Sequence, residues 1–191
     1  MNFGQLKMYI DGELVPSLNN ETKEIFSPLN DERIATLSWA NSLDSERALK
    51  SAEQGFDTWS KTPVKKRKEW MLILKDKILE KEEILRKSIS YEMGKPYNAT
   101  AEDVESITNS LKYYSDIIED YQKDKEIIDP DGTHSHHLVS KPIGVVVAYL
   151  AWNFPLLNAG FKLGPALASG CSIILKPSEL SPVSLLSLIH I

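Results

Sequence analysis

A stretch of twenty uncharged residues, from Pro142 to Phe161, restricts the possible folds of this chain more than any other feature. A run of this length could cross a bilayer as a helix. It contains Pro155 and two asparagines, however, and Lys162 follows it directly. Proline and amide side chains suit a strand, a turn and a helix start better than a lipid-facing helix. We therefore expect a soluble segment and no membrane partner.

The order of elements within residues 143–185 predicts one βαβ unit. The segment GVVVAYLA (144–151) is apolar without alternation, which is typical of a strand buried on both faces in a parallel sheet. A helix is expected to begin at Pro155 and to end before Gly170, and SIILK (172–176) is predicted to form the second strand. This order indicates an α/β fold with a parallel sheet.

Amphipathic helices are predicted ahead of that unit, after a short hairpin at 8–15 around Asp11-Gly12. Their charged faces are expected to be solvated surfaces without chemistry. The three predicted helices begin near Asp44, at Thr62 with Pro63 in the first helical position, and at Thr100; the second ends at Gly94 and the third at Tyr121.

Residues 122–142 are polar and contain an Asp131-Gly132 turn, so we expect a projecting hairpin. Histidines at 134, 136 and 137 suggest a metal site at first sight. Neighbouring residues of a strand face opposite sides, so only His134 and His136 converge, which leaves a metal site incomplete. We predict no bound metal.

Composition and charge narrow the class of protein. The 191 residues are 42% hydrophobic and 26% charged, as in ordinary globular proteins, and they suffice for one domain. The net charge of −5 argues against a nucleic-acid partner. A single cysteine, Cys171, and an N-terminus without an apolar segment favour a reducing, cytoplasmic location.

Two turns follow the predicted strands, and ligands of open α/β sheets bind beyond the carboxyl ends of the strands. Asn153 lies where the first strand gives way to a helix, so its amide either donates to an oxygen that gains charge in a reaction or caps the helix. Beyond the second strand, Glu179 either accepts hydrogen bonds from ribose hydroxyls or forms an exposed pair with Lys176. A carboxylate there would favour NAD over NADP because it repels a 2′-phosphate.

The stretch PIGVVVAYLAWNFPLLNAGFKLGPALASGCSIILKPSELSP resembles the aldehyde dehydrogenase superfamily. WNFP, KLGPALASG and KPSE stand in the order and spacing of that family, and the resemblance extends back through YEMGKP to IDGELV. It implies that residues 1–191 form a single partial cofactor-binding domain of the Rossmann-like type. The sequence has no G-x-G-x-x-G, but the family binds its dinucleotide without that fingerprint.

The resemblance also implies roles for individual residues. Asn153 matches the amide that holds the oxyanion, and Lys162 matches a lysine near the active site. Asn158 is a candidate contact for a polar substrate, although a solvated helix amide is an equal alternative. Ala151 replaces a proline found in many relatives. The implied cofactor-binding residues are Leu150, Ala151, Trp152, Lys176 and Glu179, and the implied substrate-channel residues are Phe154, Asn158 and Phe161.

For function, the resemblance implies NAD(P)-dependent oxidation of an aldehyde to a carboxylic acid through a cysteine thiohemiacetal. Succinate semialdehyde or another small aliphatic aldehyde is the expected substrate. Cys171 stands at the start of a buried strand with no neighbouring group to activate it, so we interpret it as structural. Because the family's nucleophile and general base are absent, we expect this chain alone to be inactive.

Two other functions stay open. The chain could be an assembly or regulatory fragment that uses hairpin 122–142 to pair with full-length subunits, as the homo-oligomers of the family do, or an independent dinucleotide-binding module. Residues 186–191 depart from the resemblance and equal the translation of a sequencing adaptor, so we expect them to be a non-native tail.

Overall fold

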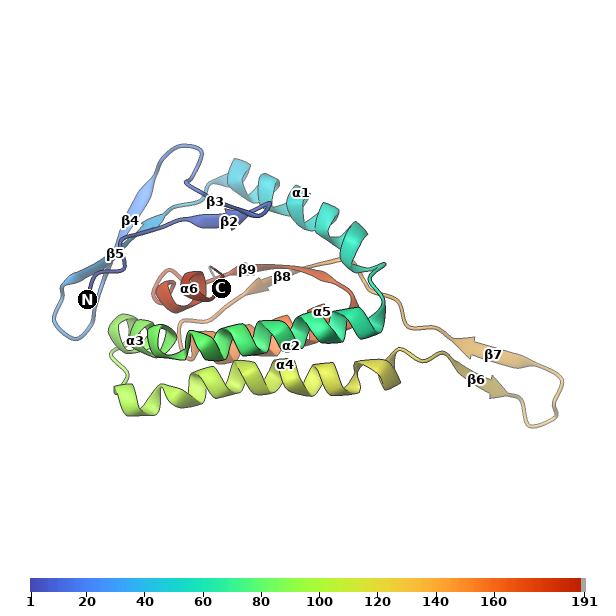
Figure 1. The fold of residues 1–191 in the computed structure, drawn as a ribbon. Coiled ribbons are helices and arrows are strands. Elements are labelled where there is room, and N and C mark those ends of the chain that lie inside the picture. Colours follow the sequence, from blue (N-terminus) through green and yellow to red (C-terminus); the bar gives the residue numbers. More distant parts are fainter. Residues whose placement is uncertain (190–191) are drawn as a thin grey trace.

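The predicted βαβ unit is present in the computed structural model, which describes residues 1–189 (Figure 1). It comprises β8 (Val145–Tyr149), α5 (Pro155–Ser169) and β9 (Ser172–Lys176). The two strands pair in parallel, with Val145 opposite Ser172 and Tyr149 opposite Lys176. Proline occupies the first position of α5, and Gly170 ends the helix at a φ of 86°. The predicted fold class is confirmed.

The β8–β9 sheet lies between two helical layers (Figure 1). Helix α1 (Ser42–Trp59) covers one face, and α5 covers the other with α2 (Val64–Glu80) and α4 (Ala101–Tyr121) behind it. The main core forms between the sheet and this second layer. Its fully buried members include Met71, Ile78, Ile107, Leu111, Leu156 and Ala159.

Helices α4 and α5 run in the same direction and approach closely, because two glycines of α5 face α4. A Cβ added at Gly160 would lie 2.9 Å from the Cα of Ile107, and one at Gly164 would lie 2.6 Å from Ser110 Oγ. Ser110 Oγ also donates to the Gly160 carbonyl over 2.7 Å. The first turns of the two helices are therefore neighbours.

Helix α1 begins slightly earlier than predicted. Asn41 is its N-cap, and Asp44 closes a capping box by accepting from the Asn41 backbone N–H at 3.1 Å. The Asp44 carboxylate also accepts from the Ser17 hydroxyl at 2.8 Å and from Leu18 N–H. Burial disfavours its charged form, but these hydrogen bonds outweigh burial and hold the pKa of Asp44 below its usual value.

The predicted helix from Pro63 to Gly94 is in fact two helices. The chain breaks at Lys81 between α2 and α3 (Glu82–Met93), and Gly94 ends α3 with a φ of 73° as predicted. Thr62 does not cap α2, because its hydroxyl donates back to the Thr58 carbonyl. Met71 and Arg67 are buried, whereas Trp70, Ile73 and Ile84 are exposed.

Helix α4 follows a single 3-10 turn, η1 (Tyr97–Ala99). Thr100 precedes α4 as predicted but does not cap it, because its hydroxyl donates to the Tyr97 carbonyl. Asp103 instead pairs with Lys95. Neither side chain caps α4: both polar groups hold the loop that enters the helix.

The N-terminal region contains a sheet that the sequence pattern did not reveal. The predicted hairpin is present as β2 (Met8–Ile10) and β3 (Glu13–Val15), with positive φ at both Asp11 and Gly12. A separate sheet has the order β1-β5-β4, and it packs on α6. The strands of this sheet and the helix it contacts are β1 (Gln5–Leu6), β4 (Thr22–Phe26), β5 (Arg33–Ser38) and α6 (Val183–Ile189).

Residues 186–189 belong to α6, and Leu186 and Leu188 are buried in the two cores. The remaining residues of the segment, 190 and 191, lie outside the described residues. The non-native origin of residues 186–191 therefore stays a prediction.

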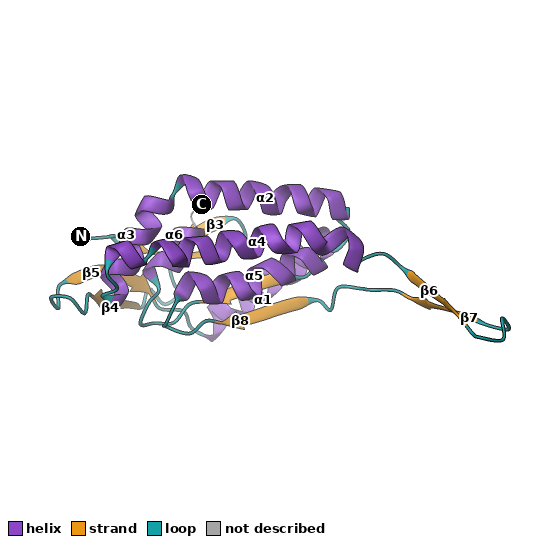
Figure 2. Cartoon of the chain, turned by 90° about the horizontal axis from the view of Figure 1, so that it is seen from below, coloured by secondary structure: helices purple, strands orange, loops and turns teal. Residues whose placement is uncertain are grey.

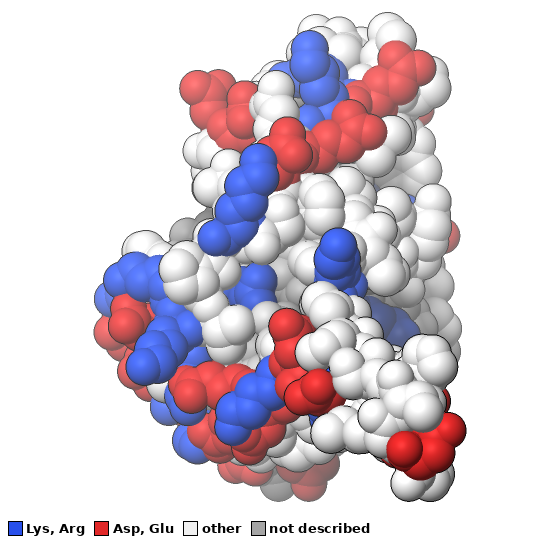
Figure 3. All heavy atoms as spheres, turned by 90° about the vertical axis from the view of Figure 1, so that its right-hand side faces the viewer, with Lys and Arg blue, Asp and Glu red and all other residues white. Residues whose placement is uncertain are grey.

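The predicted hairpin at 122–142 projects away from the body (Figures 1 and 2). Its strands, β6 (Lys125–Ile128) and β7 (Ser135–Leu138), pair in antiparallel fashion, and all their residues are exposed. On the face viewed from the hairpin end, acidic and basic side chains are interspersed (Figure 3). Within residues 1–189, no helix combines the length and apolar character that a membrane span requires.

Candidate functional site at the carboxyl edge of the sheet

The turns that follow β8 and β9 lie side by side at one edge. Leu150 N–H donates to the Lys176 carbonyl over 3.0 Å and so continues the pairing past the strands. Further on, the Ser181 hydroxyl donates to the Trp152 carbonyl over 2.8 Å. Two hydrogen bonds thus join residues 150–152 to residues 176–181 and hold the WNFP and KPSE turns together. The sequence did not identify Ser181, because only the fold brings it to Trp152.

Asn153 precedes a residue with a strained backbone. Phe154 is the N-cap of α5 and has φ 52° and ψ 58°, in the left-handed region. This conformation costs a residue with a side chain about 1–2 kcal/mol, and such strain is common at functional sites. No side chain of the described residues caps α5 at this N-cap, so the structure does not support the helix-cap alternative for Asn153, whose side chain is exposed.

The predicted substrate-channel residues follow on α5. Phe154 and Phe161 are 43% and 59% exposed. Asn158 is half-buried, and its Nδ2 donates to the Asn153 carbonyl. Its amide nitrogen therefore braces the turn. Lys162 is exposed next to Phe161.

On the neighbouring turn, Lys176 Nζ contacts Glu179 Oε2 at 3.3 Å. The pKa of Glu179 is lowered mainly by a hydrogen bond from the Glu179 backbone N–H and next by the Lys176 ammonium. The Glu179 carboxylate is therefore ionised at neutral pH. It is exposed and retains acceptor positions for further donors. A ribose hydroxyl is a donor of the right kind, so the exposed pair and the ribose-binding role are compatible.

A groove of about 590 Å³ opens beside this turn, on the sheet face covered by α1. Val147 and Ile174 are among its apolar lining residues, and Lys176 and Glu179 line it as well. A volume of this size is typical of sites for small molecules and cofactors. Apolar walls with an ionised carboxylate fit an adenosine group, whose ring is apolar on its faces and whose ribose donates hydrogen bonds.

The other predicted cofactor residues are placed differently. Ala151 and Trp152 are exposed on the adjacent turn, outside this groove. The side chain of Leu150 is only 6% exposed and packs in the main core, so it does not line the groove. Its backbone N–H sets the register of the two turns instead.

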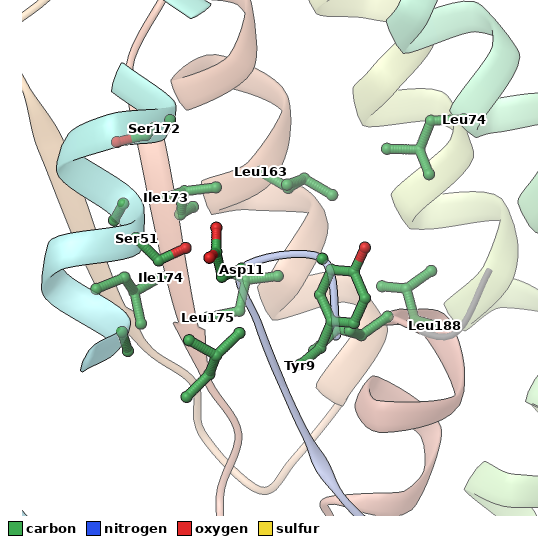
Figure 4. A pocket seen from close by; sticks show the side chains of 16 residues that line it. Tyr9, Asp11, Ser51, Leu74, Leu163, Ser172, Ile173, Ile174, Leu175 and Leu188 are labelled. Atoms are coloured by element: carbon green, nitrogen blue, oxygen red, sulfur yellow. The ribbon is translucent and has the colours of Figure 1, made fainter. Parts of the chain in front are cut away.

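A second cavity of about 440 Å³ runs along β9 (Figure 4). It is lined by four consecutive residues of the strand, Ser172 to Leu175, together with Tyr9, Asp11 and Ser51. Consecutive strand residues point to opposite faces. The cavity therefore follows the edge of β9 that does not pair with β8.

Cys171 is buried, with 2% of its surface exposed, and it precedes β9. Asn153 follows β8, and the two strands are parallel, so Cys171 and Asn153 lie at opposite ends of the strands. A strand of this length spans about 16 Å. This placement agrees with a structural role for Cys171.

In the projecting hairpin, His136 Nε2 and His134 Nδ1 both approach Asp129, at 3.1 and 3.7 Å. The two histidines converge as predicted. Among residues 1–189, however, no group of three or more histidine, cysteine or acidic side chains is arranged to hold a metal ion.

Together, the parallel βαβ unit and the paired turns define an α/β protein with a nucleotide-type binding edge. Comparison with known proteins identifies the family. The profile of the aldehyde dehydrogenase family matches residues 15–191. The chain belongs to the aldehyde dehydrogenase family, as the resemblance predicted.

Individual relatives agree. Over 186 residues the chain is 33% identical to aminoaldehyde dehydrogenase 2 of Solanum lycopersicum, covering 95% of this chain and 37% of that protein. It is 32% identical to the chloroplastic betaine aldehyde dehydrogenase of Amaranthus hypochondriacus, covering 97% and 38%. A crystal structure of betaine aldehyde dehydrogenase from Staphylococcus aureus in complex with NAD⁺ matches with a TM-score of 0.90 and 34% identity, covering 97% and 37%.

The chain therefore spans less than two-fifths of the length of the relatives it matches, and it corresponds to their N-terminal part.

Proposed function

We propose that this chain supplies the adenosine-binding and oxyanion-binding parts of an NAD⁺-dependent aldehyde dehydrogenase, which oxidises an aldehyde to a carboxylic acid. The observation that carries the proposal is the joining of the WNFP and KPSE turns at one edge, through Leu150 to Lys176 and Ser181 to Trp152. One turn then serves the reacting carbonyl and the other serves the cofactor.

For the cofactor, the Glu179 carboxylate would accept hydrogen bonds from the adenosine ribose, with Lys176 beside it. An ionised carboxylate repels a 2′-phosphate, which favours NAD⁺ over NADP⁺. Ala151 and Trp152 would border the cofactor on the adjacent turn. Bound NAD⁺ supplies the hydride acceptor.

For the substrate, the exposed Asn153 amide would donate to the aldehyde oxygen as it gains negative charge. Phe154 and Phe161 would form an apolar wall for the approaching aldehyde, and Lys162 would lie beside that wall. Asn158 would act mainly by bracing the turn, with its oxygen left for a polar substrate.

We propose a small aliphatic aldehyde, succinate semialdehyde among them, as substrate. The names of the relatives suggest a second candidate, an aminoaldehyde or betaine aldehyde. The two candidates differ in charge, so their relative rates in an enzyme that contains this segment would separate them.

The chain alone is proposed to be inactive. The family reaction needs a thiolate near the oxyanion site, and the sole cysteine of the sequence is buried at the opposite edge of the sheet. Aldehyde-dependent NADH formation by the purified chain, above a buffer blank, would contradict this proposal.

A role in assembly has its own observation. Hairpin β6–β7 projects from the body and exposes Ile127, Ile128 and Leu138. We propose that it packs on another subunit of a cytoplasmic homo-oligomer. In size-exclusion chromatography, the chain is expected to co-elute with a full-length relative. The double variant I127S/I128S is expected to elute separately from it.

The direct test of the cofactor proposal is thermal unfolding of the chain with increasing NAD⁺. A ligand that binds only the folded state raises the melting temperature with concentration. We expect NAD⁺ to stabilise the wild type and E179A to lose that effect. E69A, on the exposed surface of α2, should keep it. No stabilisation of the wild type, or equal stabilisation of E179A, would refute the proposal.

NADP⁺ provides the test of cofactor preference. NADP⁺ should raise the melting temperature of the wild type less than NAD⁺ does. In E179A the two cofactors should differ less, because the repulsion between the Glu179 carboxylate and the 2′-phosphate is removed.

A further inference from the structure

The turn that carries Asn153 is stabilised by residues of other segments, and these residues have no role in the proposed reaction. Its next residue, Phe154, has a left-handed backbone, and such a conformation persists only where the surroundings enforce it. The proline that follows restricts the backbone before it but does not favour the left-handed region. Besides the hydrogen bond from Asn158 Nδ2 to the Asn153 carbonyl, a contact from outside α5 must therefore stabilise this turn.

The contact comes from Lys95. Its Nζ lies 4.7 Å from the centroid of the Phe154 ring, which is within the range of a cation–π interaction. The Lys95 side chain is only 16% exposed. Loss of water around an ammonium strengthens its attraction to an aromatic ring. The contact is therefore stronger than an exposed pair of the same kind.

A buried carboxylate fixes the position of this ammonium. Asp103 Oδ2 lies 2.5 Å from Lys95 Nζ, and the Asp103 side chain is fully buried. The Lys95 backbone is fixed too, because Gly94 ends α3 just before it and Ser90 Oγ donates to the Lys95 carbonyl over 2.8 Å. Lys95 thus has little freedom to move away from Phe154.

The fold explains why these residues meet. Asp103 lies in the first turn of α4, and Phe154 precedes the first turn of α5. The two helices run parallel at close range through Gly160 and Gly164, so their starts are adjacent. Close helix packing thereby brings the ion pair to the Asn153 turn.

The other side of Asn153 is anchored independently. Ser181, with 1% of its surface exposed, donates to the carbonyl of Trp152, the residue before Asn153. Asn153 therefore stands between a hydrogen bond on one side and the Lys95–Phe154 contact on the other.

We propose that Lys95 is a positioning residue: oriented by Asp103, it holds the Phe154 ring and thereby sets the direction of the Asn153 amide at the sheet edge. The consequence for oxyanion binding rests on the proposed function, whereas the contact and its effect on the turn do not.

The test labels the chain with 5-fluorotryptophan and records its ¹⁹F spectrum. The sequence has four tryptophans, and the W152F variant assigns the resonance of Trp152, next to Asn153. K95M removes the charge but keeps most of the side chain. We expect the Trp152 resonance to shift by more than its line width while those of Trp39 and Trp59 stay in place. K95R keeps a cation over the ring and should restore a spectrum close to that of the wild type.

Lys66 provides a matched control, because its Nζ lies 5.7 Å from the Trp70 ring in an exposed pair on α2. K66M should move the Trp70 resonance and leave Trp152 unchanged. An unchanged Trp152 resonance in folded K95M would overturn the proposal, even if the melting temperature fell.

If K95M fails to fold, D103N decides, because it keeps the cation and removes its buried anchor. A shifted Trp152 resonance supports the proposal, and an unchanged one overturns it. The NAD⁺ melting experiment is separate. NAD⁺ should still stabilise K95M, since Glu179 is untouched, so failure of the cofactor proposal and failure of the positioning proposal give different results.

Discussion

The two faces of the β8–β9 sheet are packed in different ways. On the α5 face, which we term the packed face, helices approach so closely that Gly160 has no room for a methyl group. On the α1 face, termed the open face, a groove of about 590 Å³ lies between the sheet, α1 and the N-terminal hairpin, and a cavity of about 440 Å³ follows the unpaired edge of β9. The packed face is therefore the more closely filled of the two, and the open face leaves room for a ligand.

The difference is consistent with the chemistry proposed at the edge. An oxyanion site requires donors fixed within fractions of an ångström, which a close-packed interior provides. A cofactor site requires a largely preformed hollow with a few polar groups at its rim. One sheet offers both kinds of packing because each face contacts different elements.

The largest expected effect concerns Glu92, a buried carboxyl behind the packed face. It accepts from Val183 N–H at 2.6 Å and from Ser184 N–H, and so joins α3 to the start of α6. Burial raises its pKa from 4.5 to about 7, although these hydrogen bonds favour the charged form. The folded state therefore keeps a proton that the unfolded state has already lost.

The pH dependence follows from this difference. The contribution of Glu92 to stability is fully present below pH 4.5 and is lost as the pH rises to about 7. The loss is about 3 kcal/mol at about 1.4 kcal/mol per pH unit. Urea unfolding at several pH values should show this decline in the wild type, and E92Q should not show it. An equally steep decline in E92Q would assign the dependence to other groups.

A glycine on each face gives the most direct comparison. G160A places a Cβ 2.9 Å from Ile107 Cα, and such overpacking costs about 1–3 kcal/mol. G55A in α1 meets only Ser172 Cβ at 3.9 Å and borders the cavity along the unpaired edge of β9. An alanine is favoured over glycine inside a helix by about 1 kcal/mol, so G55A should stabilise.

The free energies of unfolding of these two variants should therefore change in opposite directions. Destabilisation by both variants, to a similar extent, would show that the open face is as closely packed as the other.

The smallest expected effect concerns Asp44, at the start of α1 on the open face. Its carboxylate holds Asn41, Ser17 and Leu18, so D44A should cost about 1–2 kcal/mol at neutral pH. Because its pKa is lowered in the folded state, its contribution is present above the ordinary value of 3.8 and is lost as the pH falls below it.

Thermal unfolding of D44A at pH 7 and pH 3 checks this sign. The difference in melting temperature between D44A and the wild type should be smaller at pH 3 than at pH 7. S45A, at the neighbouring exposed position, serves as control, since the Ser45 hydroxyl only donates to the Asn41 carbonyl.

Much of the fold could be predicted where the information is local. The βαβ unit, the hairpin at residues 122–142 and the ends of helices at Gly94 and Gly170 all depend on residues close together in the chain, through apolar runs and turn chemistry. The three-stranded N-terminal sheet was missed because β1 has only two residues and β4 buries just Ile25. Such strands lack a readable alternation.

The site divides in the same way. The sequence identified Asn153 and Glu179 because each directly follows a predicted strand. Asp103 lies in the first turn of α4, the usual place of an acidic capping residue, but its carboxylate holds Lys95 instead. An acidic residue in a first turn serves either purpose, and only its neighbours in space decide between them.

By itself, the amino-acid sequence determined the βαβ unit, the family and the two turns that follow its strands, since periodicity and motif spacing are properties of the chain. The tertiary structure alone decided that Ser181 reaches Trp152, that Lys95 reaches Phe154 and that Leu150 packs inside. These contacts join residues 29 or more positions apart. Their formation depends on how whole helices pack, which no local pattern encodes.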